Sequence, residues 1–341
     1  MNARVFLPGD PREAPLLEWL TSTLGRTAFD LAPAAADASF RRYFRISGLP
    51  DGVTRIVMDA PPPQEDCRPF VRIAAMMREA GLNAPRIFAM DLERGFLLLE
   101  DLGRETYLQA LNETNADSLF LPALDALVKW QLASRPGELP AYDEAVLDRE
   151  IQLFPDWYIA KHLGITPTPA QNETLQSQFA LIKRRNLAQA SVYVHRDYMP
   201  RNLMVSDSPP GVLDFQDALY GPISYDVACL FKDAFISWEE DRVLDWTIRY
   251  WEKAKQAGLP VPVDFATFFE DVEWMGLQRH LKVAGIFARI NYRDGKPQYL
   301  ADTPRFIGYI RAVAGRYDAL APLLYLLDQW ESREAKVGYT F

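Results

Sequence analysis

The feature that most constrains the fold is a change in hydrophobic periodicity near Gly103. Before this residue, short segments of strand character alternate with turn residues; after it, apolar residues recur at helical spacing over long segments. Strand-like segments return only around residues 191–215. This order predicts an α+β fold with two lobes and a cleft between them, in which residues 1–100 form a small strand-rich N-lobe and residues 101–341 a larger helical C-lobe.

The expected elements follow from the same periodicity. Helices are expected over residues 12–25, 69–82, 116–134, 143–164 and 172–190, and over most of the chain after Asp226. Strands are expected at residues 29–34, 40–46 and 54–60, on either side of a turn at 93–95, and at 191–195, 202–205 and 211–215.

Composition limits the classes of function. The net charge of −9 argues against a nucleic-acid partner, because no basic surplus is present to neutralise phosphates. With three histidines, and with Cys67 and Cys229 far apart, a multi-histidine or cysteine metal site is not expected, and both cysteines should be buried free thiols. The N-terminus has no signal-peptide pattern and no apolar run is long enough for a membrane span. We therefore expect a soluble cytoplasmic protein with no membrane partner.

The chemistry resides in a set of polar residues between short apolar runs. Asp197 is followed by Asn202 and, twelve residues later, by Asp214. Phosphoryl transfer from ATP needs a carboxylate that accepts the proton of the acceptor hydroxyl, and amide and carboxylate oxygens that hold Mg²⁺ against the phosphates. Asp197 suits the first role, and Asn202 and Asp214 suit the second. The alternative is a polar turn, since Asp and Asn both favour turns.

Two neighbours of Asp197 are expected to have supporting roles. A lone histidine beside a catalytic loop is more often a structural hydrogen-bonding group than a base, and we interpret His195 in this way. Arg196 could pair with a carboxylate that the sequence alone does not identify.

Two segments carry a family resemblance. "VHRDYMPRNLMV" (194–205) and "GVLDFQDALYGPISYDVACL" (211–230) resemble the aminoglycoside phosphotransferase-like family, the small-molecule branch of the protein-kinase-like fold. The resemblance implies ATP and Mg²⁺ as cofactors, and Asp226 as a residue that braces the catalytic loop. It also implies that backbone groups near Glu100 and Leu102, in "FLLLEDLG", hold the adenine. An ordinary strand end is the alternative for that segment.

The sequence departs from this family at one position. The family has a strand lysine that contacts the ATP phosphates and pairs with a helix glutamate, whereas this chain has Met58 and Phe70 at the aligned positions. Another group must then supply positive charge, or ATP binding is weakened. The candidates for contact with the phosphates are Ser39, Arg41, Arg42 and Arg45. A solvated basic strand is the alternative.

Two later segments bear on the acceptor. Trp157 and Tyr158 lie within one helical turn of Phe154, and aromatic faces suit the apolar face of a pyranose ring, although such residues more often fill a core. A basic group on a later predicted helix could bind an anionic or acetamido sugar, with a solvated helix face as the alternative. Its members are Arg279, His280 and Lys282.

The segments 153–164 and 278–305 resemble the bacterial kinases that phosphorylate cell-wall amino sugars at the anomeric carbon. The resemblance implies ATP-dependent phosphorylation of N-acetylmuramate and N-acetylglucosamine at C1 in peptidoglycan recycling, with a sugar-1-phosphate nucleotidyltransferase as the next enzyme. The N-lobe would bind the nucleotide, and the C-lobe would carry the catalytic loop, the metal site and the sugar-binding helices. The alternatives are a kinase of the choline, homoserine or aminoglycoside type and a weakly catalytic nucleotide-binding scaffold.

Overall fold

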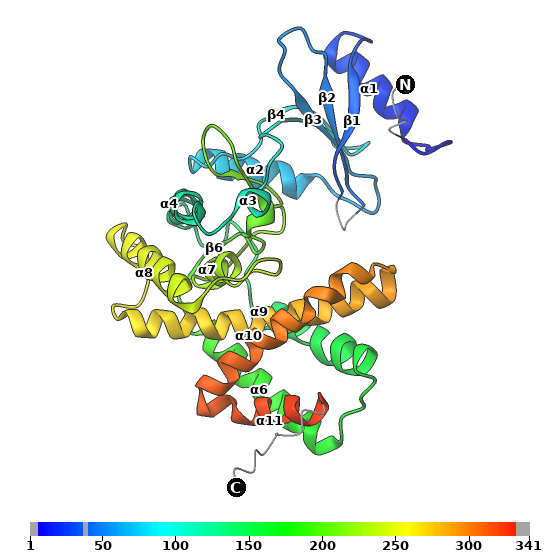
Figure 1. Cartoon of the computed structure of the whole chain (residues 1–341). Helices are drawn as coiled ribbons and strands as arrows, with labels where there is room; N and C mark the ends of the chain where they lie inside the picture. The colour runs from blue at the N-terminus through cyan, green and yellow to red at the C-terminus, as the bar shows by residue number, and fades with distance from the viewer. Residues whose placement is uncertain (1–5, 37–39, 332–341) are drawn as a thin grey trace. The chain divides into compact units, whose positions relative to one another are not determined.

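The chain divides into two compact units (Figure 1). The computed structural model describes residues 6–36 and 40–331. The first unit comprises Met1–Ala123 and Arg201–Asp217, and the second comprises Leu124–Pro200 and Ala218–Phe341. The first unit therefore includes a segment from much later in the sequence. β-bridges from Asn83 to Gly211 and from Thr106 to Met204 hold this segment in place.

The first unit is built on a five-stranded antiparallel sheet with the order β1-β2-β3-β5-β4. Its sheet strands and the short pair β7–β8 lie where the sequence predicted strands, because short runs of strand-forming residues there are bounded by turn residues. Its elements are α1 (Glu13–Leu24), β1 (Asp30–Ala36), β2 (Arg42–Ser47), β3 (Arg55–Asp59), α2 (Arg68–Glu79), β4 (Ile87–Asp91), β5 (Phe96–Glu100), α3 (Tyr107–Ala110), β7 (Leu203–Met204) and β8 (Gly211–Val212). The helix α4 (Ala116–Leu132) and the 3₁₀ turn η2 (Pro200–Asn202) continue from one unit into the other.

Helix α1 covers one face of this sheet. Its buried residues Leu16, Trp19 and Leu20 recur at helical spacing and pack with apolar residues from three strands. Those strand residues are Phe44, Ile46, Val57, Phe96 and Leu98. The helix ends at Gly25, whose left-handed φ of 63° closes its last turn, as the sequence predicted.

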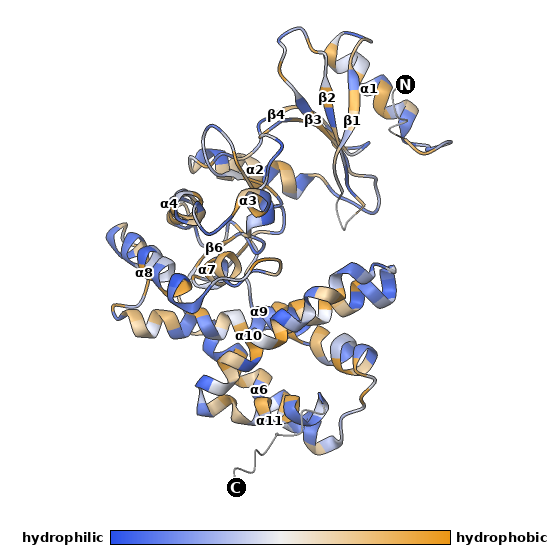
Figure 2. Cartoon of the chain, in the orientation of Figure 1, coloured by the Kyte–Doolittle hydropathy of each residue, from blue (hydrophilic) through white to orange (hydrophobic). Residues whose placement is uncertain are grey.

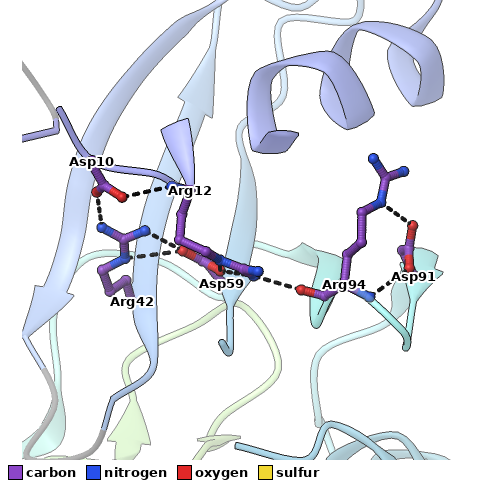
Figure 3. A network of polar contacts seen from close by, with 6 residues as sticks. All are labelled: Asp10, Arg12, Arg42, Asp59, Asp91 and Arg94. Carbon is purple, nitrogen blue, oxygen red and sulfur yellow. Dashed lines mark hydrogen bonds and ion pairs between the residues drawn. The ribbon is translucent and has the colours of Figure 1, made fainter. Parts of the chain in front are cut away.

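An ion network joins the residues just before α1 to β2 and β3 (Figure 3). The side chain of Asp59 is fully buried at the end of β3, and its oxygens accept hydrogen bonds from the Nε atoms of Arg12 and Arg42, each at 3.0 Å. Arg42 also pairs with Asp10, and Arg12 donates to the carbonyl of Arg94 at 2.6 Å. A buried carboxylate is tolerated only when it is paired in this way.

In the described residues of the second unit, the strand pair β6–β9 is the one departure from helices and loops. Its elements are α5 (Glu144–Ile151), η1 (Phe154–His162), α6 (Pro169–Leu187), β6 (Ser191–Val194), β9 (Leu219–Pro222), α7 (Tyr225–Phe231), α8 (Glu240–Gln256), α9 (Phe265–Asp294), η3 (Pro297–Asp302), α10 (Thr303–Arg316), η4 (Asp318–Leu320) and α11 (Ala321–Trp330). The 30-residue α9 packs against η1, α6, α7 and α10 and so forms the centre of this unit (Figure 1).

The prediction of one continuous helix over residues 143–164 was wrong. Residues 143–164 form α5 and then a separate nine-residue π-helix, η1. Pro155 lacks a backbone N–H and cannot continue the α-helical hydrogen bonds. Helix α9 approaches this break closely, since a Cβ on Gly285 would lie 2.3 Å from the carbonyl carbon of Leu153. A glycine is therefore required at the contact.

Both cysteines are buried free thiols, as predicted. Burial raises the pKa of Cys67 to about 11, and it raises the pKa of Cys229 as well. Since the thiolate is the reactive form, neither residue is suited to nucleophilic chemistry.

The helices carry hydrophilic and hydrophobic residues along their lengths (Figure 2). Within residues 6–36 and 40–331, no helix is both long and apolar enough to cross a membrane. Such mixed hydropathy is typical of helices that pack against a core through one apolar face.

Two glycines test the importance of a close backbone approach in the first unit. Gly95 and Gly81 have similar left-handed φ angles of 75° and 79°, but a Cβ on Gly95 would lie 1.9 Å from the Ala60 carbonyl oxygen, and one on Gly81 would meet nothing within 4 Å. We expect Gly81→Ala to lower the free energy of unfolding by about 1 kcal/mol through backbone strain alone. Gly95→Ala should lower it by about 3 kcal/mol or more, because the overlap adds to the strain. Equal losses in thermal denaturation would contradict this reading.

Candidate active site

Backbone strain singles out the predicted motif. In the described part of the chain, the non-glycine residues with positive φ are Arg196, at 77°, and Asp214, at 60°. Such residues are uncommon and persist only when their surroundings hold them, which happens most often at functional sites. One of the two directly precedes Asp197, and the other is itself a predicted metal ligand.

Asp226 holds the strained loop after β6. Its side chain is fully buried, and its two oxygens accept the backbone N–H groups of His195, at 2.7 Å, and Arg196, at 3.0 Å. This confirms the predicted bracing role. Burial raises the pKa of Asp226 to about 7, although the two N–H groups act in the opposite direction. His195 is buried and accepts a hydrogen bond from the Asp197 N–H on Nδ1 at 3.3 Å, which fits its predicted structural role.

The side chain of Arg196 is fixed by Glu150, the carboxylate that the sequence did not identify. Glu150 is buried in α5 and binds Arg196, the hydroxyl of Tyr142, and Lys282 Nζ at 2.9 Å. Burial alone would raise the pKa of Glu150, but the charges of Lys282 and Arg196 lower it to about 2. The only sequence signal for Glu150 was an acidic residue within an otherwise amphipathic helix.

The basic residues Arg279, His280 and Lys282 of α9 are buried. The alternative prediction, that they form a solvated helix face, is therefore wrong. Arg279 and Lys282 are at most 9% exposed, and Asp197 is among the acidic groups in the electrostatic surroundings of both. Burial acts to lower the pKa of Arg279, but neighbouring acidic groups outweigh it and raise the pKa. His280 is held differently, with Nε2 3.1 Å from the Lys232 carbonyl oxygen, and burial lowers its pKa well below the usual value.

In the first unit, the β7–β8 pair brings Asn202 and Asp214 together. Asn202 directly precedes β7, and Asp214 lies two residues after the end of β8. The Leu213 N–H donates to the Asn202 carbonyl at 2.9 Å. Asn202 Nδ2 lies 3.4 Å from Asp214 Oδ2, and Gln216 Nε2 donates to Asp214 Oδ1 at 2.9 Å.

This donor set fits Mg²⁺. One amide and one carboxylate are what the protein contributes where phosphate oxygens and water complete the coordination. No cluster of three or more His, Cys, Asp or Glu side chains suited to a metal occurs in the described residues. A metal at this pair would therefore depend on a ligand such as ATP.

Met58 and Phe70, which the sequence predicted at the positions of the family's lysine and glutamate, make apolar contacts. Met58 is fully buried in β3. Phe70 of α2 packs against Phe215, the residue after Asp214, with ring centroids 4.8 Å apart. The helix thus contacts the metal-site segment through aromatic rings.

The structure separates the three candidate arginines. Arg41 Nη2 lies 3.7 Å from Asp214 Oδ1. Arg42 belongs to the buried network of Figure 3. Arg45 Nε binds Asp101 Oδ2 at 2.6 Å. The structure thus brings Arg41 to the predicted metal ligand, while the other two arginines tie structural elements together.

The remaining nucleotide-site candidates are Ser39, Glu100 and Leu102. Ser39 lies outside the described residues. Glu100 ends β5, and its N–H donates to the Arg86 carbonyl at 2.8 Å. The side chain of Leu102 lies against Gly211 of β8, where a Cβ would be 3.1 Å from Leu102 Cδ1. The predicted adenine-binding segment is therefore in the same unit as Asn202 and Asp214.

Comparison with known proteins identifies the family of the chain. The sequence model of the phosphotransferase enzyme family matches residues 30–262. The chain belongs to this family. A relative from Pseudomonas aeruginosa, named N-acetylmuramate/N-acetylglucosamine kinase, is 58% identical over 87% of this chain and 88% of its own length. A relative of the same name from Neisseria meningitidis is 49% identical over 97% of this chain and 99% of its own length.

Solved structures show the fold of this phosphotransferase. A choline kinase from Cryptosporidium parvum superposes with a TM-score of 0.63 at 11% identity, over 92% of this chain and 99% of that one. A choline kinase from Streptococcus pneumoniae has a TM-score of 0.63 at 13% identity, over 88% of this chain and 99% of that one. The predicted α+β, protein-kinase-like fold is confirmed.

The aromatic pair of η1 is divided between two environments in the phosphotransferase. Tyr158 is 4% exposed, stacks on Phe154 at 5.1 Å, and donates from its hydroxyl to Glu331 at 3.2 Å. Tyr158 therefore packs in the core, which was the alternative to contact with the sugar. Trp157 is half-buried, and contact of its ring with a sugar stays a prediction.

The bracing by Asp226 can be tested with an isosteric change. In Asp226→Asn, an amide N–H₂ must face one of the backbone N–H groups of His195 and Arg196, and a buried unsatisfied donor costs about 1–3 kcal/mol. We expect a lower free energy of unfolding by that amount and a kcat at least about 10-fold lower.

Asp264→Asn is the matched control for this change. Asp264 caps α9 by accepting the Thr267 N–H at 2.9 Å, and asparagine caps helices equally well. Its stability and kcat should stay near those of the wild type. If Asp226→Asn behaved like this control in denaturation and in turnover, the loop would not depend on Asp226.

Proposed function

We propose that this phosphotransferase uses ATP to phosphorylate N-acetylmuramate and N-acetylglucosamine at the anomeric C1 hydroxyl. One observation carries the choice of acceptor: relatives with that kinase name match nearly the whole chain at 49–58% identity. The motif residues required for phosphoryl transfer are present as Asp197, Asn202 and Asp214. A scaffold that only binds nucleotide would not need all three.

Asp197 is the proposed base of the reaction. Its carboxylate takes the proton of the C1 hydroxyl and so makes the sugar oxygen nucleophilic. The hydrogen bond from its backbone N–H to His195 and the bracing of that loop by Asp226 limit its movement. Such positioning provides much of the catalysis in phosphoryl transfer.

Asn202 and Asp214 are the proposed Mg²⁺ ligands, and backbone groups near Glu100 and Leu102 are the proposed adenine site. A bound Mg²⁺ supplies neutralisation of charge on the phosphates. Gln216, which donates to Asp214 at 2.9 Å, orients the carboxylate.

Arg279 is the proposed group that recognises the lactyl carboxylate of N-acetylmuramate. Among the three buried basic candidates of α9, Lys282 binds Glu150 and His280 contacts a backbone carbonyl, whereas Arg279 Nη1 has no hydrogen-bond partner in the described structure. A buried guanidinium donor without a partner suits a carboxylate. Trp157 is the proposed stacking surface for the sugar ring.

The proposal also places the reaction in the cell. ATP as the phosphate donor favours the cytoplasm, and a sugar 1-phosphate is the substrate type that a nucleotidyltransferase converts to a nucleotide sugar. We therefore assign the enzyme to peptidoglycan recycling.

The assignment of Asp197 predicts a loss of turnover without unfolding. Asp197→Asn should lower kcat by about 10²–10⁴-fold, because the amide cannot accept the proton. Asp207→Asn, an exposed change in the same stretch of chain, should leave kcat unchanged. ATP consumption should be measured with both amino sugars, choline, homoserine and an aminoglycoside, and phosphorus NMR should locate the phosphate on C1. Turnover of choline and not of the amino sugars would overturn the proposal.

The lactyl assignment predicts a difference between the two sugars. Arg279→Ala should raise KM for N-acetylmuramate by about 10- to 100-fold, and KM for N-acetylglucosamine by less than about 3-fold. The second sugar therefore reports on folding within the same sample. Arg293→Ala, which removes an exposed arginine of α9 that pairs with Asp294, is the control and should change neither value. Equal effects of Arg279→Ala on both sugars would remove the assignment.

A further inference from the structure

We infer that Arg41, positioned by Glu65, binds the phosphate chain of the nucleotide and takes the place of the strand lysine of related kinases. The inference rests on the proposed kinase function and extends it. It concerns a single position in the first unit, directly before β2.

The usual source of positive charge is absent from β3. Met58 occupies the aligned position and is fully buried, so no cation projects from it. The next residue, Asp59, is bound by Arg12 and Arg42. Phe70 occupies the partner position on α2 and contacts Phe215. A phosphate-binding cation must therefore come from another element.

Two of the three nearby arginines have structural partners that fix them elsewhere. Arg42 lies directly opposite Asp59 in the β2–β3 register and binds it. Arg45 binds Asp101 at 2.6 Å and the Gly103 carbonyl at 2.7 Å. Burial would raise the pKa of Asp101, but its hydrogen bonds from Arg45 and Thr54 lower it. Moving Arg45 to a phosphate would leave the buried Asp101 without its arginine, and moving Arg42 would remove one of the two arginines that bind the buried Asp59. Both changes are costly.

Arg41 lies beside the predicted metal ligand. Its Nη2 is 3.7 Å from Asp214 Oδ1, and its Nε is 3.7 Å from Glu65 Oε2. The side chain is only 11% exposed, so its guanidinium is held at this place. A guanidinium has five N–H donors in a planar fork, and it can bind phosphate oxygens as well as these carboxylates.

Glu65 is itself anchored. Its Oε1 accepts the Phe40 N–H at 3.0 Å, next to Arg41 in the chain, and its Oε2 is the oxygen that faces Arg41. One carboxylate thus ties the backbone before β2 and the arginine side chain to the loop before α2. Arg41 and Glu65 lie on different elements. Together they replace the lysine–glutamate pair, with Arg41 as the cation that binds phosphate and Glu65 as the carboxylate that positions it.

The test measures nucleotide affinity of the full chain by titration calorimetry with ATP, ADP and adenosine. Arg41→Ala should weaken ATP and ADP binding by about 10- to 100-fold, the loss expected for charge-assisted hydrogen bonds. Adenosine affinity should change by less than about 2-fold, since it has no phosphate. Arg41→Gln, which keeps most of the side chain, should show the same selective loss. Glu65→Gln should show a smaller loss in the same direction.

Arg55→Ala is the matched control. Arg55 is a basic residue of β3 that pairs with Asp51 at the surface, and its removal should leave all three affinities unchanged. Wild-type affinity for ATP in both Arg41 variants, or an equal loss for ATP and adenosine, would overturn the inference. These results leave the proposed kinase function intact, since that function fails only if the wild type shows no amino-sugar-dependent ATP consumption.

Discussion

The candidate active site depends on two hydrogen bonds to a single buried carboxylate. Asp226 accepts the backbone N–H groups of His195 and Arg196 and so stabilises a left-handed backbone at Arg196. That conformation costs about 1–2 kcal/mol in a non-glycine residue. Two hydrogen bonds contribute about 0.5–1.5 kcal/mol each, so together they offset a strain of this size. The direction in which the chain presents Asp197 follows from this balance.

The second strained residue, Asp214, is held by a local arrangement. It follows β8 closely, and the β7–β8 pair brings Asn202 to it within one hairpin. The Gln216 side chain returns to Asp214 from two residues ahead. Side chains from a short stretch of sequence thus fix both predicted metal ligands, which explains why their spacing was recognisable in the sequence.

Local features of this kind were predictable, and features that depend on distant partners were not. The strands of the first unit, the capped end of α1 and the phosphotransferase motif each follow from a continuous stretch of sequence. The four-residue β9 was missed because its pairing with β6 is set by contacts across the chain. The burial of Lys282 was also missed, since it depends on Glu150, more than a hundred residues earlier.

The three arginines before and within β2 show how strand register distinguishes residues that the sequence alone cannot tell apart. In sequence they are equivalent candidates for a phosphate. In the sheet, Arg42 lies opposite Asp59, so its charge is used to stabilise the strand pair. Successive residues of an extended chain point to opposite faces, which directs Arg41 away from that network and toward Asp214. Because β3 ends in a buried acid that Arg42 helps to neutralise, Arg42 is already engaged within the strand pair, and Arg41 on the other face is the arginine that we propose for phosphate contact.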